Sequence, residues 1–458
     1  MFILLIVYKY NLTYLINPMV NLIFILLFFG GFAFFGYNVS KVIANIKLGK
    51  PKKINDNKAE RWKVMTLVAL GQKKMFKRPI PAILHSFIYV AFILTQIELI
   101  EIIIDGISGS HRFFYDKIGV LYTLVINIIE ILSVLALIAT FAFLARRNLL
   151  KIPRFHKSEM NGWPKLDGNI ILYLEFLLVM FIFLMNGTDE VLHLRGESHA
   201  IGEGGFGFAM SSWYGPILFG GMETHTLHLL ERIGWWGHLV IVLSFMNFLP
   251  YSKHFHIFLA FPNVWYSNLN PKGQLSNMEA VTNEVKIMFD PNADPYAAPP
   301  EPVGEPETFG VKDITDLSWK SILEAYTCTE CGRCTDNCPA NQTGKLLSPR
   351  KIMMDVRDRA VELGDLKRKN GKDFTDENIL LRNYITEEEI WACTSCNACV
   401  EACPVNIDPL SIIVDLRRYL VMEESKAPAE LTGMFSNIEN NGAPWQFSPT
   451  DRLNWKDE

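Results

Sequence analysis

The sequence predicts an all-α protein in which a bundle of five transmembrane helices is followed by a soluble α-helical domain. Three observations lead to this prediction. Long apolar runs fill residues 1–260 of the 458-residue chain, where 24 Lys and Arg against 16 Asp and Glu give a net charge of +8. Residues 261–458 instead hold 20 Lys and Arg against 32 Asp and Glu, a net charge of −12. All eight cysteines lie in this second part, between Cys328 and Cys403.

These shifts in composition divide the chain into four predicted parts. They are a membrane domain at 1–260, a proline-rich linker at 261–310, a cysteine-bearing domain at 311–425 and a polar tail at 426–458. Five prolines between Pro295 and Pro306 favour an extended tether. The tail is interpreted either as disordered or as a docking segment that presents Trp445 and Trp455. The total charge of −4 gives no indication of a nucleic-acid partner.

Five segments have the length and apolar character of helices that cross a membrane. A hydrocarbon core of about 30 Å takes roughly 20 helical residues. The predicted crossings are Val20–Ile46, Ala82–Ile104, Ile118–Phe143, Ile170–Met185 and Leu227–Leu249. Residues 1–15 are also apolar but contain Lys9, so they either extend the first crossing or precede a start at Met19.

The charges of the connecting loops predict the orientation in the membrane. Residues 41–80 carry twelve Lys and Arg, and residues 146–167 carry six. Residues 186–226 carry only Arg195 against five acidic residues. The two basic loops are therefore expected on the cytoplasmic side, with the N-terminus outside and the cysteine-bearing domain in the cytoplasm. We expect a multi-pass protein surrounded by the lipid of the inner (cytoplasmic) membrane.

Three of the ten histidines have a spacing that suits haem ligands. His238 and His256 are 18 residues apart, which is five helical turns, so one continuous helix would place them on the same face about 27 Å apart. Pro250 between them could bend that helix. His85 opens the second crossing at a depth similar to that of His256. Because imidazole is a common axial ligand, His85 and His256 could hold a b haem between two helices. Histidines near helix ends are more often polar interface residues, which is the interpretation favoured for His111, His156, His193 and His199.

Two stretches of the membrane domain resemble a known family. Residues 78–85, Arg-Pro-Ile-Pro-Ala-Ile-Leu-His, and residues 250–256, Pro-Tyr-Ser-Lys-His-Phe-His, resemble the start of the second helix and the last helix of the respiratory nitrate reductase gamma-subunit family. That family, like the membrane subunits of heterodisulfide-reductase-like complexes, has five helices and b haems. The resemblance implies that His85 and His256 bind the haem nearer the cytoplasm.

The resemblance also implies that His238 is a ligand of an outer haem. The partner expected for it, about ten residues after His85, falls on Thr95, and threonine is not a usual haem ligand. One haem b is therefore expected, while a second stays open. The histidines that could substitute for the missing ligand are His193, His225 and His228.

The cysteines form two runs with the same spacing, C-x₂-C-x₂-C-x₃-C-P. This spacing is typical of a ferredoxin with two [4Fe–4S] clusters, in which the fourth cysteine of each run ligates the other cluster. It predicts one cluster on Cys328, Cys331, Cys334 and Cys403, and another on Cys393, Cys396, Cys399 and Cys338. Two zinc ribbons are the alternative, but these need separated C-x₂-C pairs.

The 54 residues between the two runs have apolar residues at helical spacing, which predicts an α-helical ferredoxin. This domain resembles the iron–sulfur subunits of heterodisulfide reductase and succinate dehydrogenase. Cys331-Gly332-Arg333-Cys334 and residues 344–350 are close to the heterodisulfide-reductase-like group, in which a cysteine-rich catalytic domain often follows. No cysteine follows Cys403, so the resemblance implies a cysteine-rich iron–sulfur catalytic subunit on a separate chain.

Together these features predict a membrane-anchored electron-transfer subunit of a quinone-linked oxidoreductase complex. Quinone is the expected substrate, and electrons would pass between the quinone pool, haem b, the two clusters and the catalytic subunit. No nucleophile–base pair, Rossmann glycine motif or P-loop indicates catalysis of another kind. Glu98, Glu130 and Glu175 either face other helices or form a proton path from a quinol site. The alternatives are an anchoring or assembly protein with structural clusters, and a sensor of the quinone redox state.

Overall fold

The computed structural model describes residues 13–198, 206–291 and 308–457. The chain forms two compact units, which are Met1–Ile43 with Leu67–Phe258 and Ala44–Thr66 with Leu259–Glu458. We call these the membrane unit and the cysteine unit. The five prolines of the predicted linker lie outside the described residues. The predicted boundaries near residues 260, 310 and 425 remain predictions.

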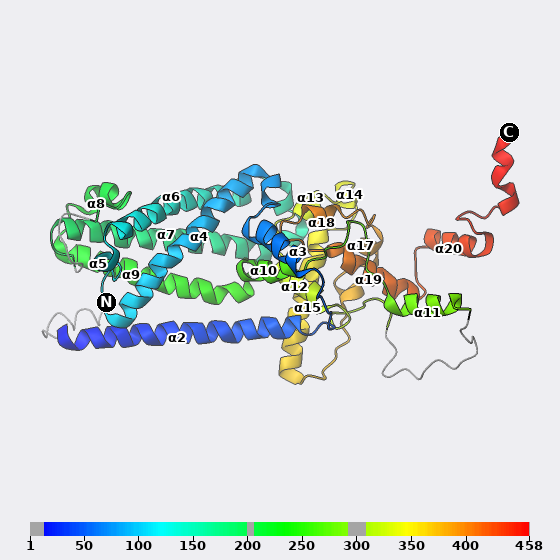
Figure 1. Ribbon diagram of the computed structural model, residues 1–458, viewed down its shortest axis with the longest axis horizontal. Coiled ribbons are helices and arrows are strands. Elements are labelled where there is room, and N and C mark those ends of the chain that lie inside the picture. Colours follow the sequence, from blue (N-terminus) through cyan, green and yellow to red (C-terminus); the bar gives the residue numbers. More distant parts are fainter. Residues whose placement is uncertain (1–12, 199–205, 292–307, 458) are drawn as a thin grey trace. The chain divides into compact units, whose positions relative to one another are not determined.

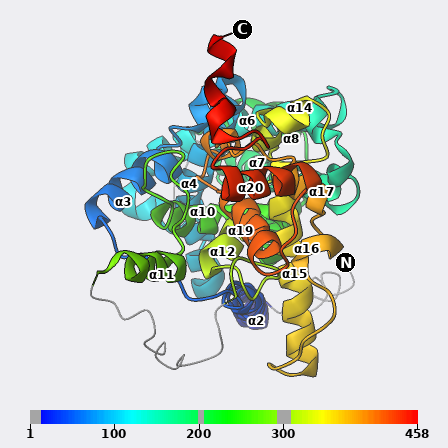
Figure 2. The ribbon, with the colours of Figure 1, turned by 90° about the vertical axis from the view of Figure 1, so that its right-hand side faces the viewer.

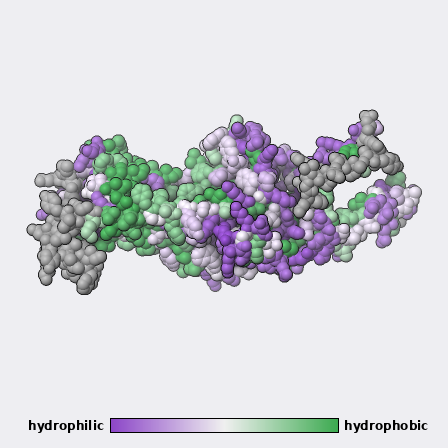
Figure 3. All heavy atoms as spheres, turned by 90° about the horizontal axis from the view of Figure 1, so that it is seen from below, coloured by the Kyte–Doolittle hydropathy of each residue, from purple (hydrophilic) through white to green (hydrophobic). Residues whose placement is uncertain are grey.

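The membrane unit is built from long helices, and the five predicted crossings are confirmed as helices. Its helices are α2 (Thr13–Ile46), α4 (Pro79–Ser108), α5 (Tyr115–Ile118), α6 (Val120–Asn148), α7 (Trp163–Leu194), α8 (Ser211–Phe219) and α9 (Thr224–Phe248), and α10 (His256–Trp265) begins at its end. Among the described residues, α2, α4, α6, α7 and α9 are long and apolar enough to cross a membrane. Figure 3 shows hydrophobic side chains gathered over these helices.

Within this unit, α7 packs against α6 and α9, and α6 packs against α4 (Figure 1). Two glycines of α9 make the contact with α7 close. A Cβ at Gly234 would lie 2.7 Å from the backbone nitrogen of Met185, and one at Gly237 would lie 2.4 Å from the ring of Phe181. Small residues allow helix backbones to approach in this way where lipid supplies no hydrophobic drive for association.

The end of α9 corrects the expectation that one helix carries both His238 and His256. α9 ends at Phe248, and two 3₁₀ turns, Leu249–Tyr251 and Lys253–Phe255, follow it. Pro250 lies in the first turn and Ser252 between them is extended, with φ −111° and ψ 148°. His256 therefore begins the separate helix α10, because proline lacks the N–H that would continue the helical hydrogen bonding.

The cysteine unit is made of shorter helices, and Figure 2 shows α12, α15 and α19 grouped together within it. Its helices are α3 (Lys58–Met65), α11 (Glu279–Phe289), α12 (Trp319–Thr327), α13 (Arg333–Asp336), α14 (Pro339–Gln342), α15 (Pro349–Asn370), α16 (Leu380–Asn383), α17 (Glu387–Trp391), α18 (Ala398–Ala402), α19 (Pro409–Met422) and α20 (Ala429–Asn441). No β-strand occurs in the described part of the chain, so the predicted all-α fold is confirmed. α20 belongs to the predicted tail, where a 3₁₀ helix also covers Pro449–Lys456.

Side-chain caps explain where several of these helices begin. Ser348 accepts a hydrogen bond from the backbone N–H of Lys351 at the start of α15, and Asp408 does the same for Ser411 at the start of α19. Both helices have proline at their first position, where its missing N–H costs nothing. Helices α13 and α18 each follow the first two cysteines of a run, contain the third, and pack against each other.

Candidate functional site

The structure brings the rings of His85 and His256 together. Their centroids lie 6.5 Å apart. Each ring also has an acceptor oxygen at Nδ1, which is Gln72 Oε1 at 3.0 Å for His85 and the Lys253 carbonyl at 3.2 Å for His256. An imidazole that carries its proton at Nδ1 presents a lone pair at Nε2, and histidines that ligate metals commonly have such an outer partner. The structure therefore brings the two predicted axial ligands together, and their role as haem ligands remains a prediction.

His254 has no role in the sequence-based prediction, yet its ring lies beside this pair. The ring centroid of His254 lies 5.3 Å from that of His256 and 5.2 Å from that of Phe245, on which it stacks. Burial lowers the pKa of His254 well below its ordinary value, and the neighbouring His256 and His85 rings lower it further. Burial also lowers the pKa of His256. The close approach depends on the break after α9, which the sequence indicated only through Pro250.

His238, the third predicted ligand, lies apart from this pair on the wall of a cavity of about 450 Å³ within the membrane unit. Its Nδ1 lies 3.3 Å from the carbonyl oxygen of Leu178. Thr95, which takes the place of the second ligand expected from the family resemblance, lines the same cavity, as does His254. Among the described residues that line it, none of the three substitute histidines occurs.

Two of the three intramembrane glutamates join a buried polar network near α8. Asn186 Nδ2 lies 3.5 Å from an oxygen of both Glu98 and Glu130. Glu130 also accepts hydrogen bonds from the backbone N–H groups of Met210 and Ser211, at 2.8 and 3.2 Å. Glu98 Oε2 has no hydrogen-bond partner in the described part of the chain. The third glutamate, Glu175, instead lines the cavity that holds His238. A proton path through these residues remains a prediction.

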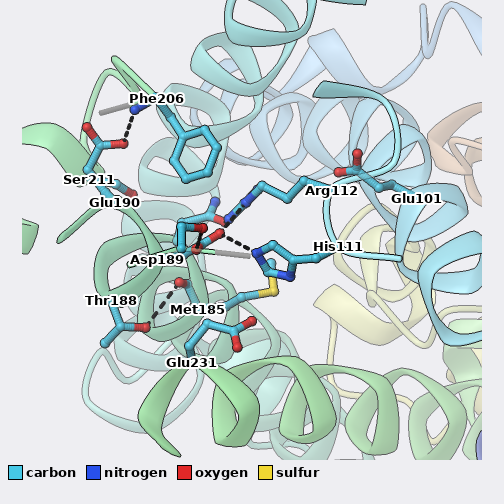
Figure 4. A network of polar contacts seen from close by, with 12 residues as sticks. Glu101, His111, Arg112, Met185, Thr188, Asp189, Glu190, Phe206, Ser211 and Glu231 are labelled. Atoms are coloured by element: carbon cyan, nitrogen blue, oxygen red, sulfur yellow. Dashed lines mark hydrogen bonds and ion pairs between the residues drawn. The ribbon is translucent and has the colours of Figure 1, made fainter. Parts of the chain in front are cut away.

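A buried ion network, which includes His111, Arg112 and Asp189 (Figure 4), adjoins this polar network. Arg112 lies 2.5 Å from Asp189 through Nε and donates to Asn186 Oδ1 at 2.8 Å. His111 Nε2 lies 2.9 Å from the same carboxylate. Burial opposes a charge on His111, but the Asp189 carboxylate outweighs that effect and raises the pKa of His111. A buried cation and carboxylate of this kind hold each other in place, since removing one leaves the other uncompensated.

In the cysteine unit, the first three cysteines of the first run meet the last cysteine of the second run. Five cysteines line one cavity. Four of them, Cys328, Cys331, Cys334 and Cys403, are the predicted ligands of the first cluster, and the fifth, Cys399, is a predicted ligand of the second. The pKa of Cys328 is raised to about 12, mainly by burial and in smaller part by nearby groups that include the Cys331 and Cys403 thiols. The fourth cysteine of the second run thus lines the same cavity as three cysteines of the first run, and crossed ligation remains a prediction.

The remaining cysteines also interact across the two runs. Burial raises the pKa of the Cys393 thiol, and the thiols of Cys338 and Cys396 contribute in the same direction. Burial likewise raises the pKa of Cys399 to about 12, with Cys393 and Cys338 adding to the shift. No three His, Cys, Asp or Glu side chains in the described ranges are placed to hold a single metal ion.

Two arginines that the sequence did not assign a role lie at the first cysteine cavity. Arg333 and Arg350 both line it, and Arg350 is completely buried. A guanidinium group at this position adds positive charge beside the thiols, and net charge is one of the factors that set the potential of an iron–sulfur cluster. The signal was present in the sequence, because both arginines belong to the stretches that carry the family resemblance.

A buried ion pair precedes the first cysteine run. Lys320 Nζ donates to Glu324 Oε1 at 2.6 Å and to Asn263 Oδ1 at 2.9 Å, and the side chains of Lys320 and Glu324 are both almost fully buried. Burial raises the pKa of Glu324 to about 7, against the opposing effect of Lys320. This carboxyl group therefore titrates near neutral pH, which the sequence alone did not indicate.

Comparison with known proteins agrees with the spacing of the cysteines. Residues 324–407 match the family of 4Fe-4S dicluster domains. One subunit of the ferredoxin/F(420)H(2)-dependent CoB-CoM heterodisulfide reductase of Methanosarcina acetivorans is 32% identical over 23% of this chain and 52% of that protein. The cysteine unit therefore contains a 4Fe-4S dicluster region that is similar to subunits of heterodisulfide reductases.

Two relatives match most of the chain. The probable iron-sulfur-binding oxidoreductase FadF of Bacillus subtilis is 29% identical over 93% of this chain and 59% of that protein. The EtfAB:quinone oxidoreductase of Syntrophomonas wolfei is 27% identical over 88% of this chain and 55% of that protein. The chain thus spans between half and three fifths of the length of these curated relatives. No solved structure matches it. The chain is similar to iron–sulfur oxidoreductases along most of its length.

Proposed function

We propose that the chain carries electrons between a quinone pool and a partner protein through one haem b and two [4Fe–4S] clusters. The observation that carries this proposal is the occurrence of a histidine pair in the membrane unit and a dicluster cysteine arrangement in the other unit. A chain that only anchored its clusters would not need a pair of facing imidazoles in the membrane unit. When bound, haem and clusters would supply reversible one-electron carriers.

The residues around His85 and His256 fit a b haem. Two bonds of about 2 Å from a metal to imidazole nitrogens, plus the half-widths of the two rings, give a centroid separation of about 6 Å. The observed value is 6.5 Å. The oxygens of Gln72 and Lys253 would fix the orientation of the two rings. The loop before α4 carries Lys73, Lys74, Lys77 and Arg78, which supply positive charge for haem propionates.

The eight cysteines fit two cubane clusters with crossed ligation. Cys328, Cys331, Cys334 and Cys403 would hold the first cluster, which is supported by the single cavity that these thiols line. Cys393, Cys396, Cys399 and Cys338 would hold the second, which is supported by the effect of neighbouring thiols of this set on the pKa of Cys393 and Cys399. The position of Cys399 on the first cavity as well implies that the two clusters would lie close together.

The partner and the location of the chain are parts of the same proposal. The relatives named as subunits of a heterodisulfide reductase support association with a catalytic, cysteine-rich iron–sulfur subunit on a separate chain. The name of the Syntrophomonas wolfei relative supports quinone as the substrate. The two basic loops, at 41–80 and 146–167, support a cysteine unit on the cytoplasmic side of the inner membrane.

The test is a reduced-minus-oxidised visible spectrum of the purified chain, with haem and non-haem iron quantified. The proposal predicts the α-band of a b-type haem and about eight non-haem irons per chain. A spectrum without a haem band would reject the haem part of the proposal. A content of about four non-haem irons per chain would show that only one cluster is present.

A further inference from the structure

The cavity beside His238 is long, apolar and enclosed by the membrane-crossing helices. Its volume is about 450 Å³. The residues of α4 that line it run from Ile88 to Ile103, which at 1.5 Å per residue corresponds to a length of about 22 Å. Cavities of roughly 300–1,000 Å³ with apolar walls and a few polar groups are typical of sites for small organic ligands. The shape suits an elongated apolar molecule with a compact polar head.

One side of this cavity reaches the lipid-facing surface of the bundle. Phe32, Phe92 and Phe258 line the cavity, and each has about half of its side chain exposed (46%, 44% and 51%). The wall that contains Phe32 belongs to α2, which is the least buried of the five spans. A ligand that enters here comes from the hydrocarbon layer, so it must be soluble in lipid.

A few polar groups interrupt the apolar wall at mid-cavity. The residues that supply them are Thr95, Gln96, Ser133, Glu175 and His238. Thr95 Oγ1 and Gln96 Nε2 donate to the carbonyl of Phe92, at 3.2 and 2.9 Å, which leaves their oxygens to accept hydrogen bonds. With its proton at Nδ1 toward the carbonyl of Leu178, His238 presents an acceptor at Nε2. These acceptors suit the hydroxyl groups of a quinol.

The same wall suits a second haem poorly. Haem carries two propionates, and burying a carboxylate without a cationic or hydrogen-bonding partner is costly. Among the described residues that line the cavity there is no Lys or Arg. A second haem would also lack the second axial ligand that the family resemblance implies, because Thr95 occupies that position in the sequence. His254 lines the cavity too, but it stacks on Phe245, two turns along α9 from His238.

We infer that this cavity binds an isoprenoid quinone, whose ring lies beside His238 and whose tail leaves between α2 and α4. The inference rests on the proposed function and identifies the cavity beside His238 as the binding site of its quinone substrate. His254 lines the cavity and its ring lies 5.3 Å from that of His256, so the bound quinone would lie close to the proposed haem. His238 is then a quinone ligand, in place of the outer-haem ligand that the family resemblance implied.

The test uses the purified full chain in detergent and the fluorescent quinol analogue heptyl-hydroxyquinoline N-oxide, whose emission is quenched on binding. Val242→Phe and Val179→Phe fill the cavity from two different helices, α9 and α7. Val240→Phe makes the same change on the exposed face of α9 and serves as the control. The α-band of the haem is recorded for each variant, to show that the bundle is folded.

We expect saturable binding to the wild-type chain and to Val240→Phe, and binding weaker by about tenfold or more in the two cavity variants, with the haem content unchanged. Undiminished binding in both cavity variants, or no binding to the wild-type chain, would overturn the inference.

His238→Leu distinguishes a quinone from a second haem as the ligand of the cavity. If the ligand is a quinone, this variant should bind the analogue more weakly and keep its haem content. If it halves the haem content instead, the cavity is a haem site. A chain that binds the analogue but contains no haem would keep this inference and reject the proposed function.

Discussion

The ring centroids of His85 and His256 lie 6.5 Å apart, with their planes tilted by 45°. His85 lies in the second turn of α4 and His256 is the first residue of α10, so the pair depends on the end of α9 at Phe248 and on the two 3₁₀ turns that follow it. The iron of a haem would fit between two imidazoles at this separation. Each ring has an acceptor oxygen at Nδ1, which would fix its orientation.

The histidine pair predicts that His85→Ala and His256→Ala each remove the same haem. In both variants the α-band of the reduced spectrum should be lost, while the non-haem iron stays constant. His254→Ala is the matched control, because its ring is adjacent but has no assigned ligand role. Gln72→Ala should weaken haem retention about 10- to 100-fold, as the loss of an outer partner commonly does. Loss of the haem in His254→Ala together with its retention in His256→Ala would show that the pairing is wrong.

Crossed ligation predicts which pairs of cysteine substitutions act on one cluster. Cys328→Ala and Cys403→Ala should damage the same cluster, so the double variant should retain about four non-haem irons. Cys393→Ala with Cys403→Ala should damage both clusters and retain almost none. Iron analysis with electron paramagnetic resonance of the reduced chain measures the outcome. If the second pair retains one intact cluster, each run ligates its own cluster and crossed ligation is excluded.

The buried Arg350 predicts a change in the potential of the first cluster. Arg350→Met removes a positive charge from the wall of the first cysteine cavity, and reduction adds an electron that this charge stabilises. The potential should fall by about 50–100 mV, for a separation of about 8 Å and an effective dielectric constant of about 20. Redox titration followed by electron paramagnetic resonance gives the value. Arg350→Lys, which keeps the charge, should recover most of it, and an unchanged potential in Arg350→Met with both clusters present would contradict this account.

Glu324 predicts a pH dependence of stability. Its pKa is raised from about 4.5 to about 7 in the folded chain, so the folded form binds the proton more tightly than the unfolded form does. This contribution to the free energy of unfolding is complete below pH 4.5 and is lost as the pH rises to about 7, with an upper limit on the order of 3 kcal/mol. Glu324→Gln stays uncharged and should lack the decline.

The measurement is the thermal midpoint of the cysteine unit in the full chain, recorded between pH 4.5 and 7.5 for the wild type and Glu324→Gln. The thermal midpoint of the wild type should fall relative to that of Glu324→Gln as the pH rises from 4.5 to about 7. Glu430→Gln alters an exposed glutamate of α20 and should follow the wild type. Parallel profiles for the wild type and Glu324→Gln would show that the buried carboxyl group does not titrate in this range.

The elements that the sequence predicted are those that depend on local composition. The five crossings follow from apolar runs of about 20 residues. The shortest predicted crossing, Ile170–Met185, is shorter than α7 because Asp167 and Asp189 lie within the helix and end the apolar run. Those two acids are tolerated because each is paired, Asp189 with Arg112 and Asp167 with Ser252. A hydropathy argument cannot foresee such partners.

The parts of the site that were missed depend on tertiary structure. His254 was given no role when one continuous helix was expected to carry His238 and His256, and the turns at Leu249–Tyr251 and Lys253–Phe255 show that this helix is interrupted. The cavity beside His238 is formed by side chains from several helices, so no single stretch of sequence encodes it. The cysteine runs were different, because their spacing specifies the ligand geometry directly.

The proposed function requires that electrons move between quinone and the clusters through a haem held by His85 and His256. The most direct measurement follows the reoxidation of the dithionite-reduced full chain in lipid vesicles after menadione is added, with the haem read by its α-band and the clusters by electron paramagnetic resonance. We predict that the haem and the clusters are both reoxidised in the wild type. In His256→Ala, which should lack the haem, we expect the clusters to be reoxidised at about one tenth of the wild-type rate or more slowly still. Clusters that are reoxidised at the same rate in His256→Ala and the wild type would contradict the account.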